Sequence, residues 1–135
     1  MRHLLFVLFL LVVPSLAQAE NCDNAGTQAD MNDCAQRELR AADKELNGEY
    51  GELKSAYDKI DGATDALVAA QRAWIKFRDA ECSLESQPSV GGSMRSVIYS
   101  NCMSRLTADR IGQIRVKLAC QEGDMTCYQL DESAN

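Results

Sequence analysis

Six cysteines constrain this chain more than any other feature of its sequence. They are Cys22, Cys34, Cys82, Cys102, Cys120 and Cys127. In an oxidising compartment an even set of thiols forms a disulfide framework, and six thiols allow fifteen pairings. No C-x-x-C spacing occurs among them. We therefore expect three structural disulfides, with metal binding and thiol redox chemistry as the alternatives.

The first nineteen residues have the pattern of a secretory signal peptide. The basic pair Arg2-His3 precedes an apolar run over residues 4–13, and Ala17-Gln18-Ala19 offers a small-residue cleavage site. The run is about half of the roughly twenty residues that a membrane-spanning helix needs. The residues before Cys22 do not form the pattern of a lipoprotein anchor. We expect cleavage after residue 19, no membrane anchor, and a periplasmic or secreted chain of residues 20–135.

Cleavage would narrow the range of mechanisms that the chain can support and change its net charge. It removes His3, the only histidine, and with it every mechanism that needs imidazole, such as a Ser-His-Asp triad or a histidine metal site. It also removes Arg2 and no acidic residue, which moves the net charge from −6 to −7. The sequence has no glycine-rich phosphate loop, no nucleophile elbow and no basic stripe for nucleic acid. We expect no enzymatic activity, no cofactor, no metal and no nucleic-acid partner.

Apolar residues recur at helical spacing, and no segment alternates as a strand would. Thr27 and Asp30 form a capping-box pattern, so a first helix is expected to begin near Gln28. Its apolar stripe comprises Met31, Ala35, Leu39, Ala42, Leu46, Tyr50, Leu53, Tyr57 and Ile60. Gly62, after Asp61, is expected to end this helix. Gly48 and Gly51 make a bend more plausible than a break.

Two further helices follow in the expected fold. The second is expected to begin at Thr64 or Asp65 and to end near Ser86, before Pro88. Its stripe comprises Leu67, Ala70, Trp74, Phe77 and Ala80 or Glu81, with Gln71, Arg72, Lys76, Arg78 and Asp79 on or beside the wet side. Ser93 is expected to cap the third helix, whose stripe comprises Val97, Ile98, Cys102, Leu106, Ile111, Ile114 and Leu118.

The economical arrangement is an all-α, three-helix antiparallel bundle or hairpin stack that disulfides hold together. If the second and third helices are antiparallel about a loop near Gly91, Cys82 and Cys102 lie at nearly the same height and can pair. Cys22 with Cys34 would pin the incoming segment to the first helix, and Cys120 with Cys127 would close a small terminal loop. We expect one domain with its core over residues 22–118 and a short tail over residues 119–135.

Residues spread over all three expected helices carry a resemblance to a known family. They are Cys22, Thr27-Gln28, Met31-Asn32, Cys34-Ala35, Ala42-Asp43, Glu45-Leu46-Asn47, Tyr50, Gln71-Arg72-Ala73-Trp74-Ile75, Phe77-Arg78-Asp79-Ala80, Cys82, Gly91-Gly92-Ser93, Cys102, Leu106-Thr107 and Arg110. Over roughly residues 22–118 the chain resembles the LprI-type lysozyme-inhibitor domain. The resemblance implies an exported, helical, disulfide-bonded bacterial domain, some members of which inhibit lysozyme. The leading expectation is a lysozyme partner; the alternative is a periplasmic adaptor or a toxin-neutralising domain.

The loop Gly91-Gly92-Ser93-Met94-Arg95 is the first candidate for the inhibitory contact. Lysozymes hydrolyse glycan with paired carboxylates in a cleft, and animal-type lysozymes are cationic. The loop offers backbone amides, a hydroxyl and an arginine that can bind a carboxylate in bidentate fashion. The structural alternative is that Gly91 and Gly92 only turn the chain and Ser93 only caps the third helix.

The segment around Trp74 is the second candidate, with Arg72 or Arg78 facing the partner. The structural alternative is that Arg78, Asp79 and Arg110 form an ion-pair set between helices. Trp74, Phe77, Tyr50 and Tyr57 are expected to fill the core.

Overall fold

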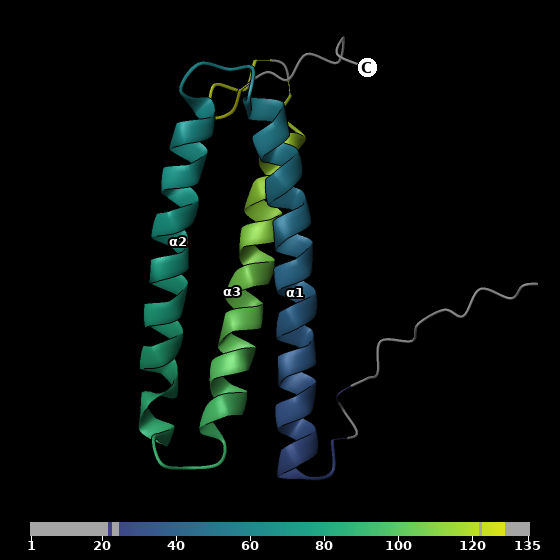
Figure 1. Cartoon of the computed structure of the whole chain (residues 1–135), viewed down its shortest axis with the longest axis vertical. Helices are drawn as coiled ribbons and strands as arrows, with labels where there is room; N and C mark the ends of the chain where they lie inside the picture. The colour runs from purple at the N-terminus through teal and green to yellow at the C-terminus, as the bar shows by residue number, and fades with distance from the viewer. Residues whose placement is uncertain (1–21, 23–24, 122, 129–135) are drawn as a thin grey trace, which may run out of the picture.

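The computed structural model describes residues 22, 25–121 and 123–128. The expected signal peptide lies outside them. The described part contains three long helices, α1 (Gln28–Tyr57), α2 (Ala63–Ser86) and α3 (Arg95–Leu118), and a short 3₁₀ turn, η2 (Gln87–Ser89), with no strand. Successive helices run antiparallel, as predicted (Figure 1). None of the helices described is long and apolar enough to cross a membrane.

The chain reverses direction at the two ends of the bundle. Residues 58–62 join α1 to α2 at what we call the turn end, and residues 87–94 join α2 to α3 at what we call the loop end (Figure 1). α3 packs along both other helices, whereas α1 and α2 touch each other little. Much of the surface of α1 and α2 is therefore left to face solvent or the space between them.

The start of α1 confirms the predicted capping box. Thr27 Oγ1 accepts a hydrogen bond from the Asp30 amide, and the Asp30 carboxylate accepts one from the Thr27 amide, both at 3.1 Å. These bonds satisfy two of the amides that a helix start leaves free. The helix continues through Gly48 and Gly51 without a break.

The end of α1 comes earlier than predicted. The helix stops at Tyr57, and Asp58 caps it while its carboxylate accepts hydrogen bonds from Lys54 and Thr64. Gly62 is instead the N-cap of α2, with a left-handed φ of 71° that favours glycine. The prediction assigned Gly62 to the end of α1, but α1 has already ended at Tyr57, so Gly62 lies at the start of α2 instead.

A continuous apolar core fills the turn end. It consists of Leu46, Leu53, Tyr57, Ala63, Leu67, Ile111 and Ile114, with Trp74, Ile60 and Tyr50 packed against it. Leu53 is 0% exposed and Ile114 is 1% exposed. Tyr128 from the tail packs edge-on against Tyr57, with 5.0 Å between the ring centroids. Burial of these side chains supplies the main stabilisation of this end.

The buried face of α2 differs from the prediction. Ala70 and Ala80 are exposed, Phe77 is 54% exposed, and Gln71 is buried in place of Ala70. A step of three residues turns a side chain by about 60° around the helix, so Phe77 leaves the face that Trp74 shares with α3. Because α2 packs mainly on α3, its buried stripe is narrow.

The disulfides are the three pairs expected from the sequence: Cys22 with Cys34, Cys82 with Cys102, and Cys120 with Cys127. Cys82 and Cys102 are buried and join α2 to α3 across 5.5 Å between their Cα atoms. No cysteine is free. Cys22 and Cys34 lie beside Glu38, but their sulfurs are bonded to each other and offer no thiolate to a metal.

Candidate functional site: a groove at the loop end

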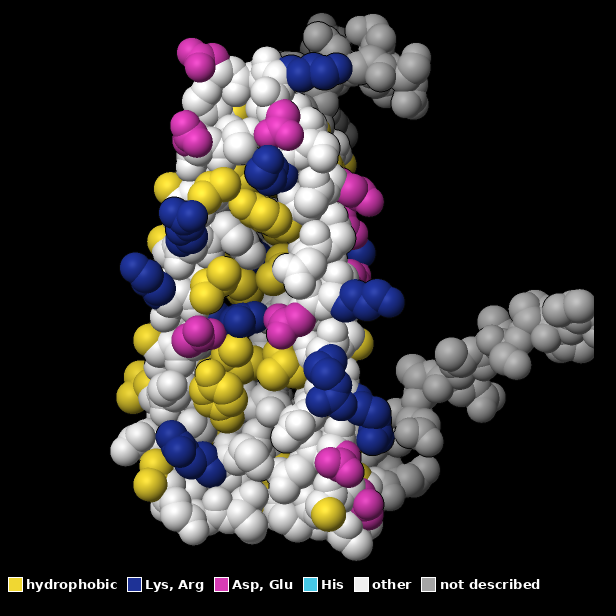
Figure 2. All heavy atoms as spheres, viewed as in Figure 1, with side chains coloured by type: hydrophobic (Ala, Val, Ile, Leu, Met, Phe, Trp, Pro, Cys, Tyr) yellow, Lys and Arg dark blue, Asp and Glu magenta, His cyan; other side chains and the backbone are white. Residues whose placement is uncertain are grey.

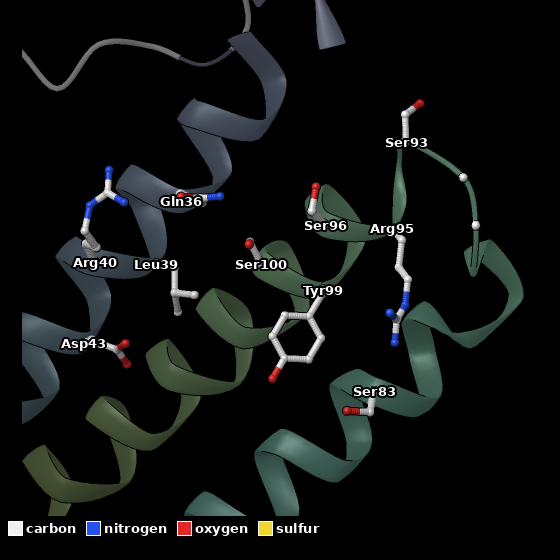
Figure 3. A pocket seen from close by; sticks show the side chains of 12 residues that line it. Gln36, Leu39, Arg40, Asp43, Ser83, Ser93, Arg95, Ser96, Tyr99 and Ser100 are labelled. Carbon is white, nitrogen blue, oxygen red and sulfur yellow. The ribbon is translucent and has the colours of Figure 1, made fainter. Parts of the chain in front are cut away.

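A groove of about 1000 Å³ opens between α1 and α2 near the loop end, with α3 at its base. It is lined by Gln36, Leu39, Arg40, Asp43, Ser83, Gly91, Gly92, Ser93, Arg95, Ser96, Tyr99 and Ser100. Figure 2 shows hydrophobic side chains gathered between α2 and α1 on this face, with charged side chains along both margins. Figure 3 shows how the lining side chains approach from all three helices.

Two glycines give the loop its shape. Gly91 has a φ of 83°, a conformation that other residues adopt only with strain. The amide of Gly92 donates to the Ser89 carbonyl at 3.0 Å, and a Cβ at Gly92 would lie 3.3 Å from that oxygen. The turn after η2 therefore needs glycine at position 91 and favours it at position 92.

Ser93 does not cap α3, which corrects the prediction. α3 begins at Arg95, and its N-cap, Met94, makes no side-chain cap hydrogen bond. The hydroxyl of Ser93 donates instead to Gln28 Oε1 at 3.3 Å, and the Ser96 hydroxyl donates to Asn32. The loop is thereby linked to the first turns of α1, while the positive end of the α3 dipole carries no capping side chain.

Two arginines line the groove without a partner. Arg95 stands at the start of α3 and Arg40 on α1, and both are exposed. Within the described part of the chain neither makes an ion pair or a hydrogen bond. Figure 3 shows Arg95 extending toward α2 beside Ser83. The sequence analysis did not predict Arg40 as a site residue, because its place on the groove depends on how α1 is rotated against α3.

Arg78 does not line the groove, but it binds Asp43, which does. The Arg78 side chain is only 12% exposed and binds Asp43 at 2.9 Å and Asp79 at 3.3 Å. It also donates to the hydroxyl of Thr107 at 3.0 Å and lies 5.0 Å from the centre of the Trp74 ring. One guanidinium thus joins all three helices, and we assign it a structural role.

Arg78 and Asp79 form an ion pair, but within α2 and not between helices as predicted, and Arg110 takes no part in the set. Arg110 donates to the side chains of Gln71 and Gln113, both at 2.9 Å. Its burial lowers the pKa of its guanidinium. The carboxylate that completes the set is Asp43 of α1, which sequence reasoning missed because helix phase alone does not show which charged groups face each other.

The groove brings together four of the six predicted contact residues, Gly91, Gly92, Ser93 and Arg95. Arg72 is exposed on α2 but does not line the groove. The single acidic residue of the lining, Asp43, is paired with Arg78. A chain with an excess of acidic residues therefore presents here a concave surface whose unpaired charges are cationic, suited to binding carboxylates or other anions.

Comparison with known proteins identifies the family. The family model described as lysozyme inhibitor LprI matches residues 19–114. An uncharacterized protein of Rhizobium meliloti (strain 1021) is 36% identical over 124 residues, which cover 82% of this chain and 89% of that protein. No solved structure shows significant similarity. The chain belongs to the LprI lysozyme-inhibitor family.

Proposed function

We propose that this protein inhibits lysozyme in the periplasm or outside the cell by inserting the loop Gly91–Arg95 into the carboxylate-bearing cleft of the enzyme. The three disulfides and the family are those of an exported protein. The observation that carries the proposal is the exposed guanidinium of Arg95, which has no partner in the described chain. A catalytic carboxylate would supply that partner through a charge-assisted hydrogen bond.

The anchoring of the loop supports this proposal. The Cys82–Cys102 disulfide ties α2 to α3 below the loop, and the Ser93–Gln28 hydrogen bond ties the loop to α1. A loop that is held before binding loses less conformational entropy on binding. Gly91 carries no side chain, so its backbone amide can approach an oxygen atom closely, whereas the Gly92 amide already donates to the Ser89 carbonyl.

Charge supports the encounter in two steps. The net charge of −6 for the whole chain attracts a cationic lysozyme over a distance set by the ionic strength. At contact, Arg95 presents a local positive charge to the negative cleft. Long-range attraction and short-range complementarity therefore act through different residues, and added salt should slow association more than it speeds dissociation.

The test is lysis of cell walls by purified animal-type and bacteriophage-type lysozymes, with and without the disulfide-bonded mature protein. We expect slower lysis by at least one of these enzymes at micromolar inhibitor. The matched control is Lys76→Gln, which removes one exposed cation from α2 outside the groove and should leave inhibition unchanged. Unaltered lysis by every enzyme at micromolar excess contradicts the proposal.

A further inference from the structure

We propose that an exposed apolar face of α2 binds a second copy of this chain, so that two α2 helices lie side by side and parallel in a dimer. This face is separate from the groove, and its use does not depend on lysozyme inhibition. The proposal rests on a continuous apolar stripe, on the spacing of its residues and on two unpaired charges that flank it.

α2 carries apolar residues on two faces. One face is buried against α3, as at Leu67 and Cys82. The other face, which we call the α2 stripe, is exposed throughout and consists of Ala66, Ala69, Ala70, Ala73, Phe77, Ala80 and Leu84. These side chains share an arc of about 100° around the helix, and no polar residue between positions 66 and 84 falls within it. Phe77 is 54% exposed and Leu84 is 68% exposed. So continuous an apolar face is typical of a helix that packs against a partner.

The spacing of the α2 stripe fits the seam of a coiled coil. Steps of four and three residues alternate along Ala66, Ala70, Ala73, Phe77, Ala80 and Leu84. This is the a/d repeat, which keeps the same face of a helix turned toward a neighbouring helix. Between residues 66 and 84 the seam is about 27 Å long, at a rise of about 1.5 Å per residue. A seam this short and rich in alanine predicts a weak, reversible association.

Two charged side chains flank the seam, and their signs favour a second copy as the partner. With Phe77 at position a of the repeat, Lys76 occupies position g and Glu81 occupies position e. In a parallel pair a g residue faces the e residue five positions later on the other helix, so Lys76 faces the partner's Glu81, and the symmetry repeats this contact. Neither side chain has an ion pair or a hydrogen bond within the described residues. Glu85, one turn after Glu81, is instead already paired with Arg105 at 2.7 Å.

The same charges determine the orientation. An antiparallel pair sets g against g and e against e, so Lys76 would face the partner's Lys76 or the partner's Ser83 and meet no opposite charge. The net charge of −6 makes two copies repel at long range, so the attraction must come from contacts at the seam. A parallel pair supplies them, and it places the loop ends of both copies at the same end of the dimer.

The experiment is sedimentation velocity of the disulfide-bonded mature protein over a series of concentrations, without lysozyme. We expect a reversible monomer–dimer equilibrium with a Kd on the order of 10 μM. Leu84→Asp places a carboxylate of each copy in the seam and should weaken dimerisation by at least about a hundredfold. The matched control is Val116→Asp, at a residue of α3 that is also 68% exposed, and it should dimerise like the wild type. Both variants should keep the thermal midpoint of the monomer, because both side chains are exposed.

Charge reversal tests the orientation. Lys76→Glu makes both flanking contacts repulsive and should weaken dimerisation by about tenfold. Adding Glu81→Lys to this variant restores opposite charges in a parallel pair and should recover the wild-type Kd. In an antiparallel pair the second substitution would restore nothing, because Lys76 and Glu81 lie on opposite sides of the seam.

Three results would each overturn the proposal: a wild type that stays monomeric at about fifty times the expected Kd, equal weakening by Val116→Asp, or a double variant as weak as Lys76→Glu. A monomeric wild type whose inhibition of lysozyme is weakened by Leu84→Asp would assign the α2 stripe to the enzyme instead of a second copy. Because the loop Gly91–Arg95 lies outside the stripe, failure here leaves the inhibition proposal standing.

Discussion

The two ends of the bundle are built on different physical principles. At the turn end, side chains such as Leu53, Tyr57 and Ile114 are buried against one another in an apolar core. At the loop end a smaller buried cluster, Cys82, Cys102 and Met103, has Leu39, Tyr99 and Leu106 packed against it, and a covalent bond joins α2 to α3. Between these ends, Arg78 holds all three helices together through polar contacts.

This difference explains how a thin bundle can carry a groove. A concave surface leaves helices apart and removes apolar contacts that would stabilise them. At the loop end the disulfide replaces part of that stabilisation by restricting the unfolded chain. The turn end supplies the cooperative core, and the loop end is left free to present unpaired arginines. The comparison predicts that substitutions at the two ends separate stability from binding.

The largest effect is expected from Leu53→Ala at the turn end. Leu53 is fully buried, and truncating a buried leucine costs about 3 kcal/mol through lost burial and the cavity left behind. Unfolding in urea measures the change, and inhibition per folded molecule should not alter. Leu84→Ala, at a residue 68% exposed, is the matched control and should cost under about 0.5 kcal/mol. Equal costs for the two variants would show that the apolar core does not dominate.

Removing the Cys82–Cys102 bond with a double serine substitution should cost about 3 kcal/mol, since it closes a segment with a sequence separation of 20. Inhibition should weaken as well, because the loop loses its anchor. The matched control removes the Cys120–Cys127 bond, whose sequence separation is 7. Its shorter loop predicts a cost of about 2 kcal/mol with inhibition retained. If only the control variant lost inhibition, the inhibitory contact would not lie at the loop end.

An intermediate effect is expected from Arg78→Gln. The substitution removes hydrogen bonds to Asp43 and Thr107 from a largely buried group, which should cost about 2 kcal/mol in thermal or chemical unfolding. Arg72→Gln, at an exposed arginine of the same helix, should cost under about 0.5 kcal/mol. A partner-binding role for Arg78 would show instead as weaker inhibition with unchanged stability.

The smallest effect concerns Tyr57 at the turn end. Burial first, and the charge of Tyr128 second, raise the pKa of Tyr57 above its ordinary value of 10.0. The folded state thus holds the phenol proton more tightly than the unfolded state. The resulting stabilisation is complete below pH 10 and is lost as pH rises from there through the folded pKa. Unfolding between pH 9 and pH 11 should show this decline in the wild type and a smaller one in Tyr57→Phe; equal slopes would contradict it.

Much of this fold could be predicted from the sequence, because helical spacing and cysteine positions are local signals. The capping box at Thr27, three helices and all three disulfide pairs were found in this way. The buried face of α2 was not predicted correctly. Because α2 packs mainly on α3, its buried face is narrow, and Phe77 lies outside it. The contact between Arg78 and Asp43, and the place of Arg40 on the groove, depend on how helices rotate against each other, which spacing within one helix does not determine.

The most direct test of the account is the inhibition constant of Arg95→Ala, measured together with its thermal midpoint. Because Arg95 is exposed and has no partner in the described chain, we predict about tenfold weaker inhibition with the midpoint unchanged. That result would place binding at the loop end and leave stability with the turn end. Full inhibition by Arg95→Ala, or a loss that only follows a lower midpoint, would contradict the account.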